Sequence, residues 1–409
     1  MKRVVITGFG AISPLGHDWA SAHQALRSGR NAVHTVDAWK DYEGLNTLLG
    51  ATAQPFDLPQ NYNRKATRSM GRVALMATRA SELALIDAGL LGHDIVRNGH
   101  MGVSYGSSAG TPSAIGDFSR MITEKSTDGI NANTYIKMMA HTAAVNIGVF
   151  FGITGRIITT SSACTSASQG IGYAFETIRS GRQIAMLAGG AEELDATQAA
   201  VFDTLFAASV ANATPEATPR PFDARRDGLV LGEGAGTLVL EEMEHALSRG
   251  AHIHGEVVGF GTNSDGSHVT QPNASTMAQA MVLALADANL APSQIGYINA
   301  HGTATNHGDI AESIATHAVF RDRVPISSLK SYMGHTLGAC GALEAWLTVM
   351  MMQHGWFAPT INLQEVDSNC APLDHIRGSG RDIQTDVVMS NNFAFGGINT
   401  SLIFRRWGH

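Results

Sequence analysis

Three segments of the sequence carry thiol or imidazole side chains in settings that suit catalysis. In the first, a β-branched run, 157–160, is followed by Cys164 and then by apolar residues at helical spacing. This pattern predicts a strand, a turn and a helix. The sulfur is then expected at the helix N-terminus, where free backbone N–H groups and the helix dipole favour the nucleophilic thiolate. A small buried core cysteine is the alternative, because free cysteines are commonly buried.

The second segment, 297–305, is a short apolar strand that ends in His301 and continues through Thr303 and Thr305. An imidazole and hydroxyl groups at a strand end suit the binding of a polar ligand that contains amides. A structural role is the alternative for His301, because half-buried histidines are frequent.

The third segment places Lys330 and His335 before an almost wholly apolar helix, expected over 337–353, that carries one carboxylate, Glu344. A buried glutamate must be paired or protonated, and Lys330 is the natural partner. An ordinary structural ion pair at a helix start is the alternative.

A fourth segment joins two apolar strands through the turn Phe395-Gly396-Gly397. Backbone N–H groups exposed by a glycine turn can hold an oxyanion. A plain hairpin with a core phenylalanine is the alternative.

Apolar runs bounded by glycine alternate with helical patterns along the whole chain, which predicts an α/β protein with largely buried strands. Helical periodicity is clear over 71–87, after Cys164 and over 276–289. The charged segment 242–252 predicts a seam near residue 250, and hence two units, 1–250 and 251–409. The strands are expected over 4–7, 101–105, 156–160, 184–188, 236–241, 255–260, 296–299, 324–328, 387–390 and 400–404.

Composition narrows the class of protein. The chain has 409 residues, 44% hydrophobic and 15% charged, which is typical of a globular enzyme with a large core. Its net charge of -7 argues against nucleic acid as a partner. The N-terminus has no targeting pattern and no apolar run is long enough to span a bilayer, so a cytoplasmic protein without a membrane partner is expected.

Metal and disulfide frameworks are not expected. Three scattered cysteines, Cys164, Cys340 and Cys370, are too few for either and are interpreted as free thiols. The 17 histidines do not form an HxxxH or HExxH pattern, so no metal site is predicted.

Taken together, the four segments resemble one family closely. Their residues and their order along the chain are similar to the motifs of the elongating β-ketoacyl-acyl carrier protein synthases. The similar blocks are Ser-Ser-Ala-Cys164-Thr-Ser, Asn299-Ala-His301-Gly-Thr-Ala-Thr305, Lys330-Ser-Tyr-Met-Gly-His335 and Asn392-Phe-Ala-Phe395-Gly-Gly. The resemblance covers residues 3–405. It implies the thiolase fold, a five-layer αβαβα sandwich of two duplicated halves, normally assembled as a dimer.

The activity implied by the resemblance is a decarboxylative Claisen condensation of an acyl group on Cys164 with malonyl-acyl carrier protein, in fatty acid, polyketide or aryl polyene synthesis. His301 and His335 would stabilise the enolate, and backbone N–H groups of Cys164 and Phe395 would hold the oxyanion. Lys330 and Glu344 would orient His335, and Phe395 would gate the site. No bound cofactor is implied, because the substrates arrive on the phosphopantetheine of the carrier.

The resemblance also assigns binding positions and partners. Thr270, Thr303 and Thr305 match positions that hydrogen-bond the pantetheine arm. Arg64, Lys65, Arg68 and Arg72 match the region that docks the acidic acyl carrier protein, although a solvated helix face is the alternative for such a cluster. The dimer is expected to be a homodimer, or a heterodimer with a subunit similar to a chain-length factor.

Two departures from the family pattern bear on the acyl substrate. Cys164 is followed by Thr-Ser-Ala-Ser where Thr-Ser-Gly is usual, and the segment 192–198, Glu-Glu-Leu-Asp-Ala-Thr-Gln, differs from the usual loop. Tyr105 and Phe151 are expected near the acyl tunnel or a dimer contact, which leaves room for an unsaturated or aryl polyene chain. A thiolase, a chain-initiating synthase and a non-catalytic chain-length factor are the rival readings, and retention of Cys164, His301 and His335 argues against them.

Overall fold

The computed structural model describes residues 1–408 and contains long buried strands that alternate with helices, as the sequence predicts. The helices are α1 (Trp19–Ser28), α2 (Arg64–Thr67), α3 (Arg72–Asp87), α4 (Ser113–Glu124), α5 (Ala132–Met138), α6 (Thr142–Phe151), α7 (Ser166–Arg179), α8 (Ala196–Thr204), α9 (Met243–Ser248), α10 (Ala274–Ala288), α11 (Asn306–Phe320), α12 (Lys330–Met333) and α13 (Cys340–His354). Short 3₁₀ turns precede two of them, η3 (Ala163–Thr165) before α7 and η6 (Leu337–Ala339) before α13.

The strands form one large sheet and two small ones. They are β1 (Val4–Ile12), β2 (His34–Thr35), β3 (Leu49–Ala51), β4 (Met101–Gly106), β5 (Ile157–Thr160), β6 (Ala185–Glu192), β7 (Leu231–Gly232), β8 (Gly234–Glu242), β9 (Gly255–Ser264), β10 (Tyr297–Asn299), β11 (Pro325–Ser327), β12 (Trp356–Phe357), β13 (Asp374–His375), β14 (Arg381–Asp382), β15 (Val387–Ala394) and β16 (Ile398–Arg405). The large sheet has 11 strands in the order β13-β11-β10-β15-β16-β9-β1-β8-β6-β4-β5.

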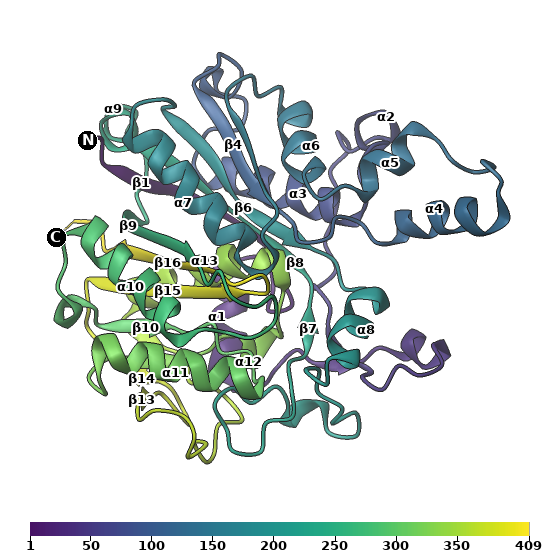
Figure 1. Cartoon of the computed structure of the whole chain (residues 1–409). Coiled ribbons are helices and arrows are strands. Elements are labelled where there is room, and N and C mark those ends of the chain that lie inside the picture. The colour runs from purple at the N-terminus through teal and green to yellow at the C-terminus, as the bar shows by residue number, and fades with distance from the viewer. Residues whose placement is uncertain (409) are drawn as a thin grey trace.

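This sheet consists of two halves with the same connectivity. In the first half β1 pairs antiparallel with β8, β8 antiparallel with β6, and β6 and β4 continue in parallel to β5. In the second half β9, β16, β15, β10 and β11 repeat these pairings in the same order. A short antiparallel contact between β1 and β9 joins the halves at the centre. Figure 1 shows the first half in the upper part of the molecule and the second half below it.

Helices cover both faces of each half and complete the layers of the thiolase fold. Helices α3 and α6 pack on the outer face of the first half, and α10 packs on that of the second, against β9 and β16. The central layer consists of α7 and α13, which contact each other and strands of both halves. Helix α13 is buried along almost its whole length, because both of its faces meet a sheet.

The strands predicted from apolar runs are confirmed, and several extend beyond the predicted ends. Strand β1 continues to Ile12 and β15 to Ala394, through glycines, asparagines and other residues that lack the apolar pattern. The two-residue strands were not predicted, because two residues cannot show an alternation. Their positions depend on the segments that pair with them.

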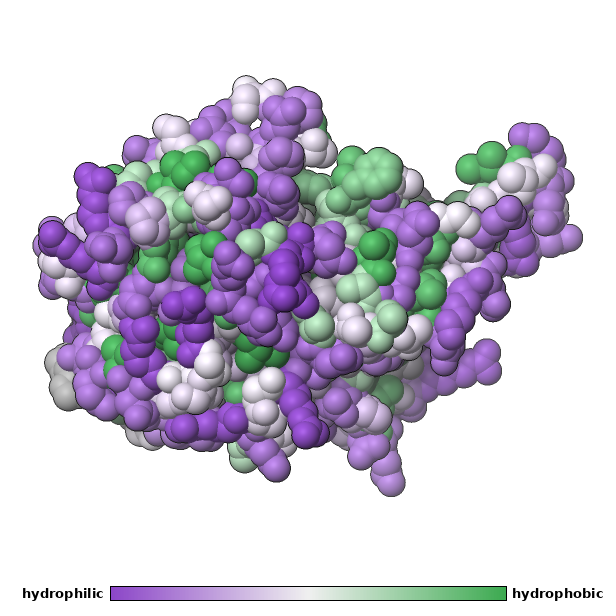
Figure 2. All heavy atoms as spheres, turned by 90° about the horizontal axis from the view of Figure 1, so that it is seen from below, coloured by the Kyte–Doolittle hydropathy of each residue, from purple (hydrophilic) through white to green (hydrophobic). Residues whose placement is uncertain are grey.

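The outer surface is mainly hydrophilic, with separate hydrophobic patches, on the face drawn in Figure 2. Helices α4 and α5 form an arm that projects from the first half (Figure 1). This arm exposes Ile115, Ile122 and Tyr135. Within residues 1–408, the helices are too short or too polar to cross a membrane.

Candidate active site

Cys164 lies at the entrance to the central layer. It is the middle residue of η3, directly after β5, and the regular helix α7 begins at Ser166. The turn begins with Ala163 at a φ of 51°, a left-handed conformation that is uncommon for residues other than glycine. Such conformations persist where the surrounding structure enforces them, often at functional sites. The prediction of a helix entrance is therefore confirmed, with a tighter turn at the sulfur than the sequence pattern indicated.

Burial of Cys164 opposes the thiolate that a helix start is expected to favour. Burial raises the pKa of Cys164 to about 12. The positive charge of Lys330 and the backbone N–H groups of Phe395 and of Cys164 itself lower this pKa, but they do not offset the desolvation. The helix-dipole argument holds for a solvated helix end, whereas this thiol is only 5% exposed.

His335 is held directly against the sulfur. Its Nε2 atom lies 3.0 Å from Cys164 Sγ, and its Nδ1 accepts a hydrogen bond from the Leu337 backbone N–H at 3.2 Å. Because Nδ1 is an acceptor, the proton of the neutral ring lies on Nε2. The backbone of His335 is hydrogen-bonded to that of Val230 and Gly232, so the position of its Cα, from which the ring extends, is fixed.

His301 lies in the loop after β10, with its ring beside that of His335. The ring centres of His301 and His335 are 5.1 Å apart and nearly perpendicular. The carboxylate of Glu312 accepts the backbone N–H groups of His301 and Gly302, each at 2.7 Å, and fixes the loop after β10. Burial, followed by the charge of Lys330, holds the pKa of both histidines well below the usual range. Both rings are therefore neutral hydrogen-bond donors near pH 7.

The predicted partnership of Lys330 and Glu344 is confirmed. Lys330 Nζ lies 2.5 Å from Glu344 Oε1, and both side chains are buried. Glu344 also accepts from Asn392 Nδ2 at 2.7 Å and from Asn299 Nδ2 at 3.3 Å. Burial is the largest single influence on the pKa of Lys330 and lowers it, but the charge and hydrogen bond of Glu344, together with Cys340 and Glu312, offset this and raise it. A charged ammonium group is thus maintained below the sulfur and the two rings.

The predicted glycine turn joins β15 to β16 and brings a backbone donor to Cys164. The N–H of Phe395 points at Cys164 and stabilises negative charge there. Gly396 and Gly397 have φ of 89° and 70°, and a Cβ on Gly397 would meet Asp265 Cβ at 2.7 Å. Glycine is therefore required for this path of the turn.

A cavity of about 120 Å³ opens beside Cys164. Its apolar wall consists of Ala163, Val201, Phe202, Leu337 and Phe395. The rings of Phe395 and Phe202 are in contact, with centres 5.3 Å apart. Two polar side chains, Ser108 and Gln198, also line the cavity.

The threonines predicted to bind substrate fall into two places. Thr303 and Thr305 lie together after His301, and their hydroxyl oxygens are 2.9 Å apart. Thr270 is exposed on the loop between β9 and α10, where its N–H donates to His268. That loop touches the glycine turn, because Gly396 N–H donates to Val269 O at 2.8 Å.

The basic cluster is divided by the structure. Arg64, Lys65 and Arg68 are exposed at α2, and they form no ion pair within residues 1–408. Arg72 instead binds Glu233 through two of its guanidinium nitrogens, Nε and Nη2, with Nε 2.9 Å from Oε2. Its charge is therefore largely neutralised by a partner within the chain.

Four residues near the site escaped the sequence reasoning. Cys340 Sγ lies 3.2 Å from Cys164 O, and Glu192 accepts from Ser108 N–H at 2.7 Å and Gly338 N–H at 3.1 Å. Glu312 and Gln198 complete the set. Glu192 and Gln198 are the two ends of the departing segment 192–198, but only the tertiary contacts reveal what they touch.

The expectation that Tyr105 and Phe151 lie near the acyl tunnel or a dimer contact stays a prediction. Both side chains are buried in the hydrophobic core of the first half, and neither lines the cavity beside Cys164. The hydroxyl of Tyr105 donates to Gly190 O at 3.2 Å, which explains how a phenol is tolerated there.

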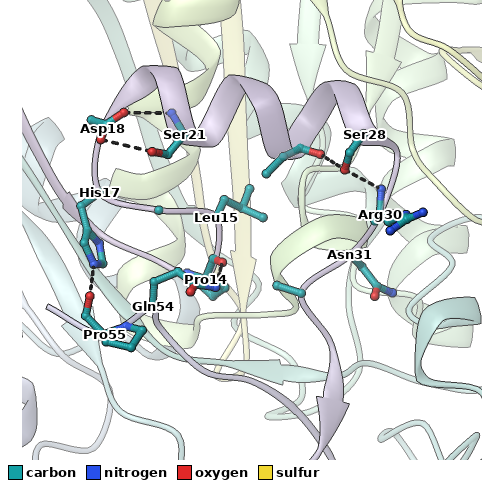
Figure 3. Close-up of a pocket in the computed structure, with 13 residues that line it drawn as sticks. Pro14, Leu15, His17, Asp18, Ser21, Ser28, Arg30, Asn31, Gln54 and Pro55 are labelled. Carbon is teal, nitrogen blue, oxygen red and sulfur yellow. Dashed lines mark hydrogen bonds between the residues drawn. The ribbon is translucent and has the colours of Figure 1, made fainter.

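A larger hollow of about 540 Å³ lies away from these residues, around α1 (Figure 3). Its polar groups are mostly paired with one another: His17 contacts Pro55 O at 3.0 Å, and Asp18 caps α1 through Ser21 N–H at 2.9 Å. Its serine hydroxyls serve the ends of α1: Ser21 Oγ donates to Asp18 Oδ2 at 3.2 Å, and Ser28 Oγ donates to Ala25 O at 2.7 Å. The hollow therefore indicates no catalytic chemistry.

The thiol and the two imidazoles also have the donor types of a zinc site, with their ligand atoms within 4.8 Å of one another. The charge of Lys330 lowers the pKa of both histidines, so the local potential opposes a cation. The same potential favours a negative charge that develops on a substrate oxygen.

Comparison with known protein families agrees with this geometry. Residues 1–246 match the family model "Beta-ketoacyl synthase, N-terminal domain", and residues 254–364 match "Beta-ketoacyl synthase, C-terminal domain". The chain is 36% identical over 409 residues to 3-oxoacyl-[acyl-carrier-protein] synthase 1 of Escherichia coli K12, covering 99% of each protein. It is also 36% identical to 3-oxoacyl-[acyl-carrier-protein] synthase 2 of Synechocystis, covering 99% of this chain and 98% of that protein.

Solved structures show the same fold. A β-ketoacyl synthase from Burkholderia phymatum is 60% identical, with a TM-score of 0.98 and coverage of 99% of this chain and 100% of that one. The ishigamide ketosynthase/chain length factor is 32% identical, with a TM-score of 0.90 and full coverage of both chains. A type II polyketide ketosynthase in complex with its acyl-carrier protein is 28% identical, with a TM-score of 0.87 and coverage of 99% of each chain.

Proposed function

The chain belongs to the β-ketoacyl synthase family and is an acyl-transferring condensing enzyme, and we propose that Cys164, His301 and His335 carry out its two half-reactions. The observation that carries this assignment is the 3.0 Å approach of His335 Nε2 to Cys164 Sγ, with His301 beside it. The thiol can form a thioester with an acyl group, and the two neutral imidazoles beside it can donate hydrogen bonds to an enolate oxygen.

In the first half-reaction, Cys164 Sγ attacks the carbonyl of an acyl thioester carried on the phosphopantetheine of an acyl carrier protein. The new C–S bond forms, the old one breaks, and the carrier thiol leaves with the proton that the cysteine gave up. The N–H groups of Cys164 and Phe395 stabilise the tetrahedral oxyanion. These donors and Lys330 also lower the cost of the transient thiolate.

In the second half-reaction, malonyl-carrier loses carbon dioxide and leaves an enolate. Neutral His301 and His335 donate hydrogen bonds to its oxygen, and the charge of Lys330 supports them. The enolate carbon then attacks the acyl carbonyl, a C–C bond forms, and Cys164 leaves and regains a proton. No resident cofactor is needed for these steps. Lys330 and Glu344 act as positioning residues, while Thr270, Thr303 and Thr305 bind the pantetheine arm.

Carrier docking is assigned to the basic cluster, mainly to its three exposed members. Arg64, Lys65 and Arg68 present free positive charge to an acidic carrier, whereas Arg72 is engaged by Glu233. Charge reversal of the exposed three should therefore raise the KM for acyl carrier protein more than Arg72→Gln does. Acyl transfer from a small pantetheine thioester serves as the control and should not change.

We assign the protein to a dimer in the cytoplasm. Each chain of the dimer consists of two units, 1–250 and 251–409. Support for a subunit contact comes from β5, which is an open edge of the large sheet with Ile157 41% exposed. The arm of α4 and α5, which exposes Ile115, Ile122 and Tyr135, lies in the same half. A homodimer and a heterodimer with a subunit similar to a chain length factor are both compatible with these surfaces. Light scattering of the purified chain distinguishes them.

The test of the proposed function is intact mass spectrometry of the enzyme after exposure to a panel of acyl-carrier proteins. The wild type should gain the acyl mass on Cys164, and Cys164→Ser should form no condensation product. Cys164→Gln should decarboxylate malonyl-carrier at least as well as the resting wild type, because its amide mimics the acylated residue. A folded variant of either kind that condenses at the wild-type rate would show that Cys164 is a core residue.

A further inference from the structure

The cavity beside Cys164 contains one polar group with an unexplained environment, the amide of Gln198. This side chain is 8% exposed, and neither Oε1 nor Nε2 has a hydrogen-bond partner within residues 1–408. Ser108, the other polar residue of the wall, is satisfied because its hydroxyl donates to Glu192. Buried polar groups in folded proteins are nearly always paired, so an amide left open in a cavity requires an explanation.

The surroundings of Gln198 make an accidental placement costly. On α8 its neighbours Ala199 and Phe202 pack into the same hydrophobic cluster as Cys164. An apolar side chain would fit this environment without desolvating an amide. Gln198 also closes the segment 192–198, in which the sequence departs from the family pattern.

We propose that the acyl group accepted on Cys164 carries a hydroxyl that pairs with the amide of Gln198. A hydroxyl donates to Oε1 and accepts from Nε2, so it satisfies both open atoms at once. A ketone can only accept, and a saturated chain can do neither. The proposal rests on the function assigned above, because the hydroxyl reaches Gln198 only when its acyl group is attached to Cys164.

The size of the cavity places this hydroxyl near the thioester. The cavity measures about 120 Å³, which is small beside the roughly 300–1,000 Å³ of common ligand pockets. Only the first carbons of an acyl chain fit next to Cys164 in this volume. A substituent that meets Gln198 is therefore on a short chain or close to the carbonyl carbon.

The test measures the rate at which Cys164 gains acyl mass from pantetheine thioesters. Butyryl, 3-hydroxybutyryl and 3-oxobutyryl groups are compared, together with hexanoyl and 5-hydroxyhexanoyl groups. In at least one pair the wild type should load the hydroxyacyl group about tenfold faster than its saturated partner, because a site built to bond a hydroxyl rejects the analogue that lacks it. Gln198→Met keeps the side-chain length and should bring that ratio close to one.

Val201→Ala is the matched control, since Val201 lines the same cavity on the same helix without a polar group. It should change absolute rates without changing the ratio. Equal loading of both members of each pair by the wild type, or faster loading of the oxo group, would overturn the proposal while leaving the condensing activity intact. A Gln198→Met variant that weakens the dimer and leaves the ratio unchanged would assign the amide to a subunit contact instead. If no thioester acylates Cys164, the proposed function fails, and this inference fails with it.

Discussion

The two halves of the fold place the same local structure at the entrance to each central helix. Helix α7 begins after η3, and α13 begins after η6. Each 3₁₀ turn opens with a left-handed residue other than glycine, Ala163 at a φ of 51° and Leu337 at 45°. Counting from these residues, Cys164 in the first half corresponds to Gly338 in the second.

The two entrances differ in what faces the second position of the turn. Cys164 faces a cavity, the imidazole of His335 and the N–H of Phe395. Gly338 faces the Glu192 carboxylate, which would lie 2.6 Å from an added Cβ. Glu192 binds Gly338 N–H and the Ser107–Ala109 loop, so it ties the second half to the first. The same turn therefore serves two purposes. At Cys164 it has a cavity and hydrogen-bond donors around it, which suit catalysis, whereas at Gly338 it is filled by Glu192, which joins the two halves.

The largest expected effect comes from the buried charge of Lys330, which acts on Cys164 and both histidines at the first entrance. Lys330→Met leaves Glu344 buried without its cation, and this should lower the free energy of unfolding by about 3–5 kcal/mol. Urea unfolding followed by circular dichroism measures the loss. Lys40→Met, which removes an exposed pair with Asp37, is the control and should change nothing measurable. Adding Glu344→Leu should recover much of the stability, and an unchanged midpoint for Lys330→Met would contradict the argument.

The second prediction separates the chemistry of the two histidines from that of the thiol. His301→Ala should lower malonyl decarboxylation by about a hundredfold while acyl transfer to Cys164 remains measurable, because only the enolate depends on this donor. Release of carbon dioxide and the acyl mass on the enzyme report the two steps. His317→Ala, on the same chain segment but outside the site, is the control. Equal loss of both half-reactions would mean that the roles are misassigned.

The third prediction tests the attachment role of the second entrance. Gly338→Ala should lower the free energy of unfolding by about 1–3 kcal/mol, because the new methyl group meets Glu192 Oε2 at 2.6 Å and Ser108 N at 2.8 Å. Gly116→Ala on α4, where the added carbon meets nothing within 4 Å, is the matched control and should not destabilise. If both variants unfold at the same denaturant concentration, Glu192 does not fill that entrance tightly.

The fourth prediction concerns the protonation of Cys164. Burial raises the pKa of Cys164 to about 12, so the reactive thiolate is a minor form that grows as the pH rises. Its alkylation by iodoacetamide should accelerate by about tenfold per pH unit between pH 7 and 9. Peptide mapping should find Cys164 modified before Cys340, which is fully buried. A rate that levels off below pH 8 would show that the thiolate is already formed at rest.

Much of the site was predictable from residue type and position. Strand ends and helix starts marked Cys164, His301, His335 and the Lys330–Glu344 pair as candidates, and the resemblance to the family assigned their roles. The burial of Glu344 in an apolar helix also demanded a cation, and the nearest one in sequence was the correct one. The helix start, which favours a thiolate, was predictable, but the depth of burial, which opposes it, was not.

The sequence by itself determined the local elements, since helical and strand periodicities depend on neighbouring residues. It also determined which residue types could perform acyl transfer. Only the tertiary structure decided that Arg72 is occupied by Glu233, that Glu192 fills the second entrance and that Gln198 opens into the cavity. These three depend on contacts between segments far apart in the chain. Whether a polar side chain is paired, exposed or left open is a property of those contacts, and no local pattern contains it.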